Sequence, residues 1–503
     1  MATVNAHLRH RSTLDAYLRS HSKVKVINST NNRKSGAEND NKSHTPSSLP
    51  GSKGKKLIKL PTIHSTSERK TKATFDSLPD ELIAIILWKL KVGDLVNASQ
   101  VCKRWHKVAN DNSLWKHFYA RFVGPTSKEE EDDIPIQDLK DGCWKNLCLK
   151  QCRIKRDKIY LKKWRQPDSY TGLKQRPELT LSKVGVRFEL SLTNTSNVTW
   201  SASHSDIYWH TLSASLRWYD LTFPDLQSLR AVRIYACSPL MFYGPSKPAK
   251  DGILQKSLLT EFKGNLKETL QKTKPVGSDT HVELYEVFSG LIVALYKADN
   301  EIAFVTFSCH YHNMISRCLS GTPDKCWEMS EATGIKDDID PHYGLHGYTC
   351  VLLVRNMRQK LLECKFVDLF TTKNKLNGGF ALFNPVRKED KMTHITCLKE
   401  NNFPWKTNLF KGVVKDVGIL DITLLDERGE PFWTVTSCVA VKQSSQTNQF
   451  EFDPEAYQSI HYEDTVGKID LDIGKLDDGR QYLSFVEISI SVTAINKLYS
   501  TSY

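Results

Sequence analysis

The chain has 503 residues, of which 40% are apolar, 10% aromatic and 25% charged, and its formal net charge at pH 7 is +13. This composition excludes a collagen-like, coiled-coil or wholly disordered protein, and at roughly 150 residues per domain the length allows two to four domains. No segment approaches the ~20 consecutive apolar residues that span a bilayer, and the N-terminus lacks the apolar stretch of a secretory signal. The sequence therefore predicts a soluble protein, cytoplasmic or nuclear, without membrane insertion.

The positive charge is concentrated in the first 73 residues. They hold 15 Lys and Arg against 4 Asp and Glu, whereas the remaining residues hold 55 against 53. Residues 1–73 lack apolar periodicity, so we expect a disordered basic tail. Its clusters Lys53–Lys56 and Arg69–Lys72 suit nuclear import or nucleic-acid contacts, but a solvated linker is the favoured interpretation. The near-neutral remainder offers little attraction for phosphate, so nucleic-acid binding is not expected.

The twelve cysteines include no Cys-x-x-Cys pair, and in a reducing compartment we expect free thiols. Two groupings contain residue types that bind metals. The first is Cys143, Cys148 and Cys152, and the second is Cys309, His310, His312, Cys318 and Cys326. The first lacks a fourth ligand and the second fits no zinc spacing. No metal site and no cofactor are therefore predicted.

Residues 74–122 are predicted to form a small unit of three helices. Asp76 or Ser77 can cap the first helix, Pro79 suits its first turn, and Asp80-Glu81 complement its positive end. Apolar residues then recur at spacings of three and four: Leu82, Ile83, Ile86, Leu87 and Leu90. A unit of ~50 residues buries only ~60% of its unfolded surface. Some of these side chains should therefore face a partner, unless the rest of the chain covers them.

The motifs of this unit resemble an F-box in order and in spacing: Leu78-Pro-x-Glu-Leu82, Ile86-Leu87, Leu90, Asp94-Leu95, Val101-Cys-Lys-Arg-Trp105 and Leu114-Trp115. The resemblance implies docking on the Skp adaptor, and through it on the cullin scaffold and the RING subunit of a ubiquitin ligase. It also implies that a set of residues lies either in the core or against the adaptor, without separating the two roles: Leu78, Pro79, Leu82, Ile86, Leu87, Leu95, Val101 and Trp105. Trp88 stands at a variable position of the family.

Residues 123–178 are predicted to connect this unit to the rest of the chain. The acidic run Glu129–Asp133 is expected to be a solvated loop. From Asp138 to Trp164 apolar residues recur at helical spacing, with basic residues between them. The helix should end near Pro167, and Tyr170–Leu173 suits a turn. A stiff helix would hold a bound client at a fixed distance from the conjugating enzyme.

Residues 179–503 change to the alternating pattern of β-strands. About a dozen runs such as Val184–Leu192 have this composition. Asp426–Gly429 suits a hairpin turn with glycine at positive φ. One helix is expected at about Ser257–Lys272. We therefore expect an α+β chain whose largest part is a mostly antiparallel β-sandwich, jelly-roll-like in its number of strands.

Several segments of this body resemble the F-box only protein 15 family: Tyr343–Tyr348, Trp405-Lys-Thr, Asp421–Glu427 with Gly429, Pro431-Phe-Trp433 and Ala494-Ile-Asn496. The similarity extends from about Phe75 to the end and excludes the basic tail. It implies a substrate-recognition adaptor in which residues 179–503 bind an unidentified protein client, with no catalysis by this chain.

Enzyme signatures are absent from the sequence, including GxSxG, HExxH and phosphate-binding loops. No catalytic residue is therefore predicted. His346 in a glycine-rich turn, and the acidic group Asp337, Asp338 and Asp340, are better explained as local structure. Two alternatives remain open. One is a β-sandwich that recognises glycans on glycoprotein clients, and the other is a hydrolase that uses His310, His312 or His346 with a carboxylate.

Overall fold

The computed structural model describes residues 78–123, 142–161, 167–174, 176–240, 253–326, 345–372, 375–387, 395–396, 398, 402–443, 457–475 and 481–499. All of them belong to the second of the two units into which the chain divides, Thr74–Tyr503. The basic tail, the acidic run Glu129–Asp133 and the group Asp337, Asp338 and Asp340 lie outside the described residues.

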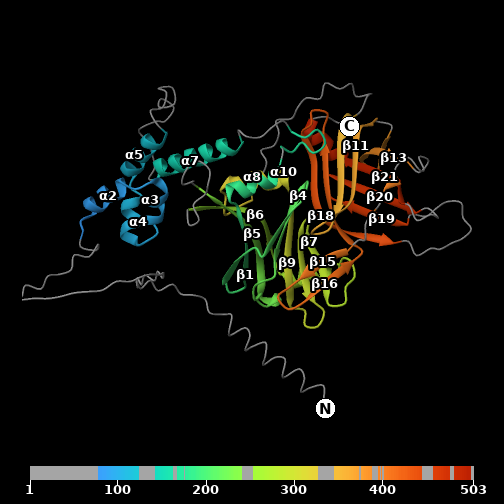
Figure 1. The fold of residues 1–503 in the computed structure, drawn as a ribbon, viewed down its shortest axis with the longest axis horizontal. Helices are drawn as coiled ribbons and strands as arrows, with labels where there is room; N and C mark the ends of the chain where they lie inside the picture. Colours follow the sequence, from blue (N-terminus) through green and yellow to red (C-terminus); the bar gives the residue numbers. More distant parts are fainter. Residues whose placement is uncertain are drawn as a thin grey trace, which may run out of the picture. The chain divides into compact units, whose positions relative to one another are not determined.

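Helices come first along the described chain, and strands dominate after residue 186 (Figure 1). The α+β class predicted from the sequence is confirmed: a helical region precedes a large antiparallel β-rich domain with few helices. The helices of the first part are α2 (Asp80–Trp88), α3 (Val92–Ala98), α4 (Lys103–Ala109), α5 (Asn112–Val123), α7 (Cys143–Leu161) and α8 (Pro177–Val184).

Two sheets form the first half of the β domain. One has the order β2 (Thr199–Ser203), β1 (Arg187–Asn194), β5 (Leu229–Pro239), β6 (Leu254–Lys263). The other has the order β3 (Asp206–Trp209), β4 (Ser213–Trp218), β9 (Ile302–His310), β8 (Leu291–Tyr296), β7 (Val282–Phe288). All their pairs are antiparallel.

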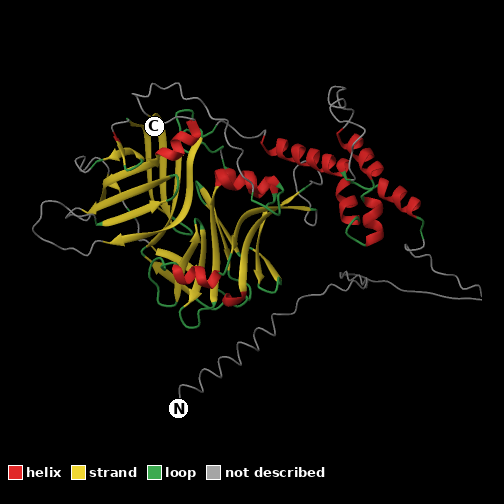
Figure 2. Cartoon of the chain, turned by 180° about the vertical axis from the view of Figure 1, so that it is seen from behind, coloured by secondary structure: helices red, strands yellow, loops and turns green. Residues whose placement is uncertain are grey.

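The second half is built on a curved ten-stranded sheet (Figure 2). Its order is β11 (Lys360–Thr371), β10 (Leu345–Arg355), β17 (Val417–Leu425), β18 (Pro431–Gln443), β19 (Gln458–Glu463), β20 (Gly467–Lys475), β21 (Gln481–Ser491), β13 (Phe380–Val386), β12 (Leu376–Asn377), and β14 (Ile395–Thr396) pairs with β21. A separate hairpin joins β15 (Asn402–Lys406) to β16 (Lys411–Lys415). Many neighbours are consecutive strands, so hairpins and meanders dominate the connections.

The five-stranded sheet is covered on both faces. One face packs in a core with β1, β5 and the helix α10 (Tyr311–Ser320), through residues such as Leu216 and Phe307. The opposite face packs in a second core with Val417 and Ile419 of the large sheet, through residues such as Phe304. Every residue of β9 is therefore buried, which explains why its sequence is an almost continuous apolar run.

The predicted helix at Ser257–Lys272 is wrong in its first half. Residues Leu254–Lys263 form strand β6, and only Leu266–Lys272 form a helix, α9. Gly264 between them has φ +142, a value that excludes helix, and the Asn265 side chain caps α9 by accepting from the backbone N–H of Glu268. Further helices were not anticipated: α5, which makes four helices of the unit predicted to have three, α8, α10 and the C-terminal α11 (Val492–Tyr499).

Some glycines are required only because their φ is positive, whereas others also have no room for a Cβ atom. Gly429 in the predicted hairpin turn has φ +76, and a Cβ added there would meet open space. Gly290, between β7 and β8, has φ +87, and a Cβ there would lie 2.2 Å from the carbonyl oxygen of Ser308. The β7–β8 turn therefore packs backbone to backbone against β9.

We predict that Gly290→Ala lowers the free energy of unfolding by clearly more than Gly429→Ala. The second change costs only the left-handed conformation, about 1–2 kcal/mol, whereas the first adds a steric clash with a main-chain atom. Chemical denaturation of the two variants measures the difference. Equal losses would show that the β7–β8 turn can move away from β9.

Candidate functional site

The apolar side chains of α2 divide between the core of the helical unit and solvent. Ile83 and Leu87 are buried, and they pack with Leu95, Trp115 and Phe118. The opposite face of the helix carries three large apolar side chains that are exposed: Leu82 by 45%, Ile85 by 55% and Ile86 by 42%. Because residues three and four apart lie on one side of a helix, these three form a continuous surface, which we call the α2 apolar face.

The structure separates the eight residues that the F-box resemblance left together. Leu87 and Leu95 are buried in the core of the unit. Leu78 and Trp105 are partly buried against that core. Pro79, Leu82, Ile86 and Val101 are exposed, Val101 by 66%. The exposed members are therefore available to a partner, whereas Leu87 and Leu95 support the fold.

Two exposed residues of α2 were not included in the predicted set. Ile85 belongs to the α2 apolar face, and its spacing of three from Leu82 was a signal in the sequence. Trp88 is 46% exposed, and its ring lies 4.4 Å from that of His117 on α5. Trp88, which stands at a variable position of the family, thus lies at the periphery of the helical unit.

Polar contacts hold α2 against α4. The Arg104 guanidinium binds the Asp80 carboxylate at 2.7 Å and donates to the backbone carbonyl of Leu78. At the start of α4 the Cys102 sulfur accepts from the backbone N–H of Trp105. The two Arg104 contacts fix the beginning of α2, so the α2 apolar face is presented by a helix whose other side is packed and anchored.

Helix α7, the predicted connector, begins inside the core of the helical unit. Its buried Cys148 and Cys152 pack with the residues of α2, α3 and α5, and Trp144 makes an edge contact with Tyr119. The contact with Cys148 and burial both raise the pKa of the Cys152 thiol. These cysteines therefore act as small apolar side chains in the core.

Residues that follow Cys152 in α7 bind the β domain. The Arg156 side chain is buried, and it donates to the Ser238 hydroxyl and to the Pro239 carbonyl at the end of β5, at 3.1 and 3.0 Å. Its neighbour Asp157 balances its charge at 2.8 Å. The Arg153 guanidinium donates to the carbonyl of Ser320 at the end of α10. Thus α7 makes side-chain contacts with both parts of the chain.

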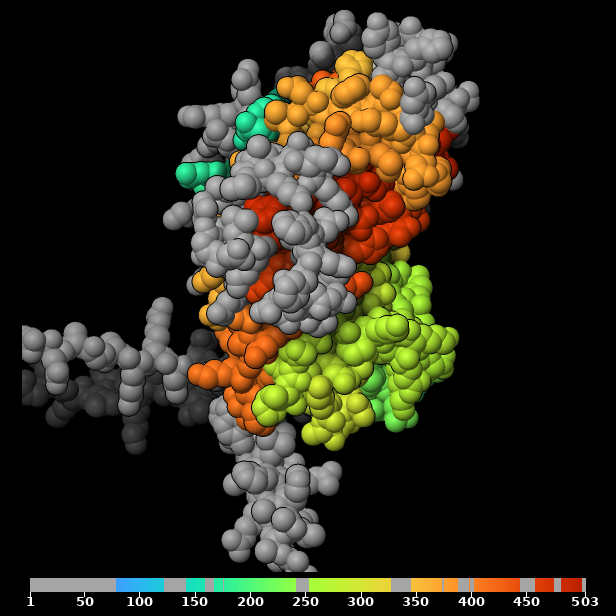
Figure 3. Space-filling model, turned by 90° about the vertical axis from the view of Figure 1, so that its right-hand side faces the viewer, coloured from blue at the N-terminus to red at the C-terminus, as the bar shows by residue number. Residues whose placement is uncertain are grey.

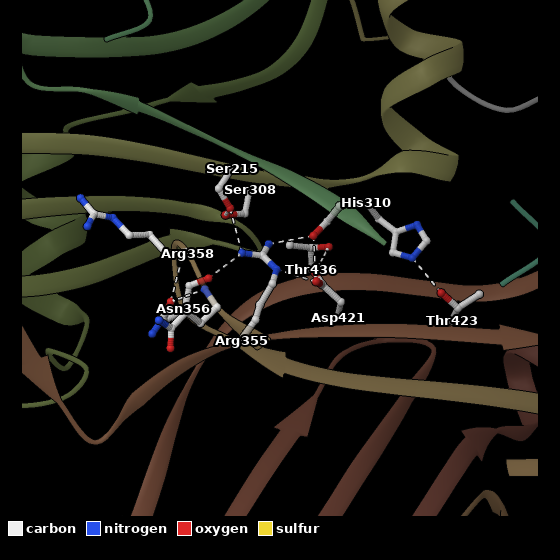
Figure 4. Close-up of polar contacts among 11 residues, drawn as sticks. Ser215, Ser308, His310, Arg355, Asn356, Arg358, Asp421, Thr423 and Thr436 are labelled. Carbon is white, nitrogen blue, oxygen red and sulfur yellow. Dashed lines mark hydrogen bonds and ion pairs between the residues drawn. The ribbon is translucent and has the colours of Figure 1, made fainter. Parts of the chain in front are cut away.

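A buried ion pair within the large sheet is hydrogen-bonded to the five-stranded sheet (Figure 4). Arg355 of β10 and Asp421 of β17 meet at 2.6 Å, and both side chains are 0% exposed. Arg355 also donates to the hydroxyls of Ser213 and Ser215 on β4. Asp421 accepts from the hydroxyls of Ser213 and Thr436. Both charges are thus satisfied by several hydrogen bonds, as burial requires.

The histidines considered as ligands or catalytic groups make structural contacts. His310 and His312 stack with ring centroids 5.4 Å apart. His310 Nε2 bonds the Thr423 hydroxyl at 2.8 Å, and His312 Nε2 donates to the Thr171 carbonyl at 2.8 Å. Burial lowers the pKa of both rings, so both are neutral at pH 7. His346 instead lies at the surface, 3.3 Å from the Glu427 carboxylate.

A metal site or a membrane span would each need a particular arrangement of side chains or helices. Within the described ranges, no set of three or more His, Cys, Asp or Glu side chains is arranged to hold a metal ion. Among the helices that the structure describes, none has both the length and the apolar character needed to cross a bilayer.

Comparison with known proteins identifies the helical unit. Residues 75–121 match the F-box-like family model, so the chain contains an F-box-like domain. Homologues named F-box only protein 15 then cover most of the chain. The protein of Macaca fascicularis is 26% identical over 440 residues, which are 85% of this chain and 100% of that protein. The protein of Bos taurus is 26% identical over 446 residues, 86% of this chain and 94% of that protein. The resemblance drawn from the sequence motifs is confirmed.

Other similarities are partial. An F-box/kelch-repeat protein of Arabidopsis thaliana is 33% identical over 93 residues, 18% of each chain. A solved structure of MucB in complex with MucA(peri) aligns with a TM-score of 0.10 and 7% identity, over 64% of this chain and 94% of that one. A score this low supports no conclusion about the fold.

We predict that truncating the α2 apolar face leaves stability nearly unchanged, in contrast to truncating the core behind it. Leu82→Ala or Ile86→Ala should change the free energy of unfolding by about 0.5 kcal/mol or less. Leu87→Ala and Leu95→Ala should cost about 2–5 kcal/mol because they leave cavities. Thermal or denaturant unfolding measures both pairs. A large loss for the exposed pair would mean that another part of the chain covers α2 in solution.

We also predict that Asp421→Ala destabilises the β domain by about 3–5 kcal/mol, because it leaves the buried Arg355 charge without its partner. Replacing both residues, as in Arg355→Met with Asp421→Leu, should cost less than the single change. Removing the exposed lysine of the pair Lys360–Glu363 by Lys360→Ala is the matched control, with an expected cost under about 1 kcal/mol. A double variant as unstable as the single one would contradict this account.

Proposed function

We propose that this chain is the substrate-recognition adaptor of a Skp–cullin–F-box ubiquitin ligase. The F-box-like match of residues 75–121 supports this assignment. The observation that carries it is the α2 apolar face, since Leu82, Ile85 and Ile86 remain exposed on a helix that is otherwise packed. In this proposal the α2 apolar face docks on the Skp adaptor, which links the chain to the cullin scaffold and the RING subunit.

The energetics of docking are favourable for a surface of this kind. Fully burying each large apolar side chain contributes about 1.5–3 kcal/mol. Leu82, Ile85, Ile86 and Val101 together offer several such contributions. A partner that covers them would gain affinity without rearranging the core formed by Ile83 and Leu87.

The remaining parts of the chain have complementary roles in the proposal. The β domain holds a protein client, and α7 sets the distance between the client and the ligase core. Helix α7 contacts the helical unit through Cys148 and Cys152 and the β domain through Arg153 and Arg156, which suits a rigid connection. A stiff spacer keeps the effective concentration of client lysines high near the conjugating enzyme. The chain would act in the cytoplasm or nucleus, where cullin ligases work.

The proposed role requires no catalysis by this chain, in line with F-box proteins in general, which are typically non-catalytic receptors. The histidines of the hydrolase alternative, His310 and His312, make hydrogen bonds to Thr423 and Thr171 that fix the packing of distant segments. The glycan-reading alternative has no specific observation in its favour.

We predict that Leu82→Ala combined with Ile86→Ala abolishes co-purification of the Skp adaptor while the β domain stays folded. The exposed pair Val198→Ala with Leu409→Ala in the β domain is the matched control and should leave adaptor binding unchanged. Co-expression and pull-down measure binding, and circular dichroism checks the fold. Adaptor binding at wild-type affinity by the α2 variant would refute the proposed docking surface.

A further inference from the structure

A cavity of about 730 Å³ opens where the connecting segment around residues 168–174 meets the five-stranded and the ten-stranded sheets. Parts of the chain that are far apart in sequence line it: residues 168–174 with 176–178, residues 209–211 and residues 353–365. In Figure 3 the teal atoms of the connecting segment lie beside the orange atoms of β10 and β11. The volume falls within the ~300–1,000 Å³ that is typical of binding clefts.

The walls of this cavity are held in place by specific contacts. The Asp168 carboxylate accepts from the backbone N–H groups of Tyr170 and Thr171 and from the Thr171 hydroxyl, which closes the turn. The Thr171 carbonyl accepts from His312, and the Lys365 ammonium lies 5.0 Å from the Tyr170 ring centroid. The buried Arg355, held by Asp421, contributes to the lining from β10. A ligand would therefore meet a largely formed site.

Positive charge is in surplus along the lining. The Glu363 carboxylate is shared by two lysines, Lys360 and Lys365. Asp168 is occupied by its own turn, and Glu178 lies in the first turn of α8, where the helix dipole stabilises a negative charge. The Arg176 guanidinium, in contrast, has no hydrogen-bond or ion-pair partner among the residues that the structure describes.

Two further features mark the lining as a binding surface. Arg176 has φ +58, a sparsely populated conformation for a residue with a Cβ, and such strain gathers at ligand-binding positions. His210 Nε2 is buried without a hydrogen-bond partner. Burial lowers the pKa of His210 to about 3, so the ring is neutral and can donate or accept. The adjacent Trp209 is half-buried and stacks on Tyr311.

We propose that this cavity binds an extended segment of the client protein that carries an acidic side chain beside an aromatic or large apolar one. The Arg176 guanidinium and the two lysines of β11 would bind the carboxylate, and Trp209 would contact the apolar side chain. Strand β11 lies at one end of the described strand order but comes close to β13, so the client segment would be held through its side chains. This inference rests on the proposed adaptor function and adds the chemistry of the segment that is recognised.

The test uses the full chain bound to the Skp adaptor and a random peptide display library as the probe. We expect the selected peptides to be enriched in Asp or Glu next to an aromatic or large apolar residue. For a synthetic peptide made from the selected sequence, Arg176→Glu and Lys365→Glu should each weaken binding by about tenfold or more, and added salt should weaken it further. Arg230→Glu, an exposed arginine outside the cavity, is the matched control and should leave binding unchanged. Thermal unfolding verifies that all three variants are folded.

Each other outcome overturns the inference. Selection of no peptide, selection without acidic enrichment, or equal binding by the cavity variants would remove the cavity from client recognition. Glycan-array binding that Arg176→Glu abolishes, in place of peptide binding, would assign the site to carbohydrate instead. Adaptor co-purification is measured separately. The α2 variant should lose adaptor co-purification and keep peptide binding, whereas the cavity variants should keep adaptor co-purification and lose peptide binding. A failure of one proposal can therefore be distinguished from a failure of the other.

Discussion

The ion pair between Arg355 and Asp421 is the contact on which the arrangement of the β domain depends. The two residues lie on the neighbouring strands β10 and β17 of the large sheet, and both reach serine hydroxyls on β4 of the five-stranded sheet. The two charges neutralise each other within the large sheet, and the serine hydroxyls of β4 supply the further hydrogen bonds that a buried pair needs, which favours the sheet-to-sheet register that delivers them. Apolar contacts between Phe304 and Ile419 fill the same interface but would tolerate small shifts, because the hydrophobic effect is non-directional.

The position of the cavity follows from this register. Arg355 lies in its lining, and the connecting segment reaches the same place because His312 holds the carbonyl of Thr171. Gly172 in that segment has φ +60, and a Cβ there would lie 3.0 Å from the Leu425 side chain. The segment therefore lies close against β17. A candidate recognition surface thus results from contacts whose first role is to hold the fold together.

The helical unit shows the opposite use of apolar residues. In the β domain both faces of the five-stranded sheet are covered. The helical unit instead leaves Leu82, Ile85 and Ile86 exposed on a helix whose opposite side is packed. Burial within the unit stabilises α2, and exposure outside it provides a surface for another protein. Helix α7 packs with both parts, which suits its proposed role as a stiff spacer between the client and the ligase core.

The sequence by itself determined the features that depend on neighbouring residues. It predicted the helix that starts near Pro79, the glycine turn at Gly429, the change from helical to alternating periodicity, and the F-box motifs. Only the tertiary structure decided which side of α2 is buried, because Leu82, Ile83, Ile86 and Leu87 are equally apolar and differ only in what packs against them. The pairing of Arg355 with Asp421 and the meeting of residues 168–174 and 176–178 with 209–211 and 353–365 also required it. Periodicity and capping act over a few residues, whereas these contacts join residues that only the complete chain topology brings together.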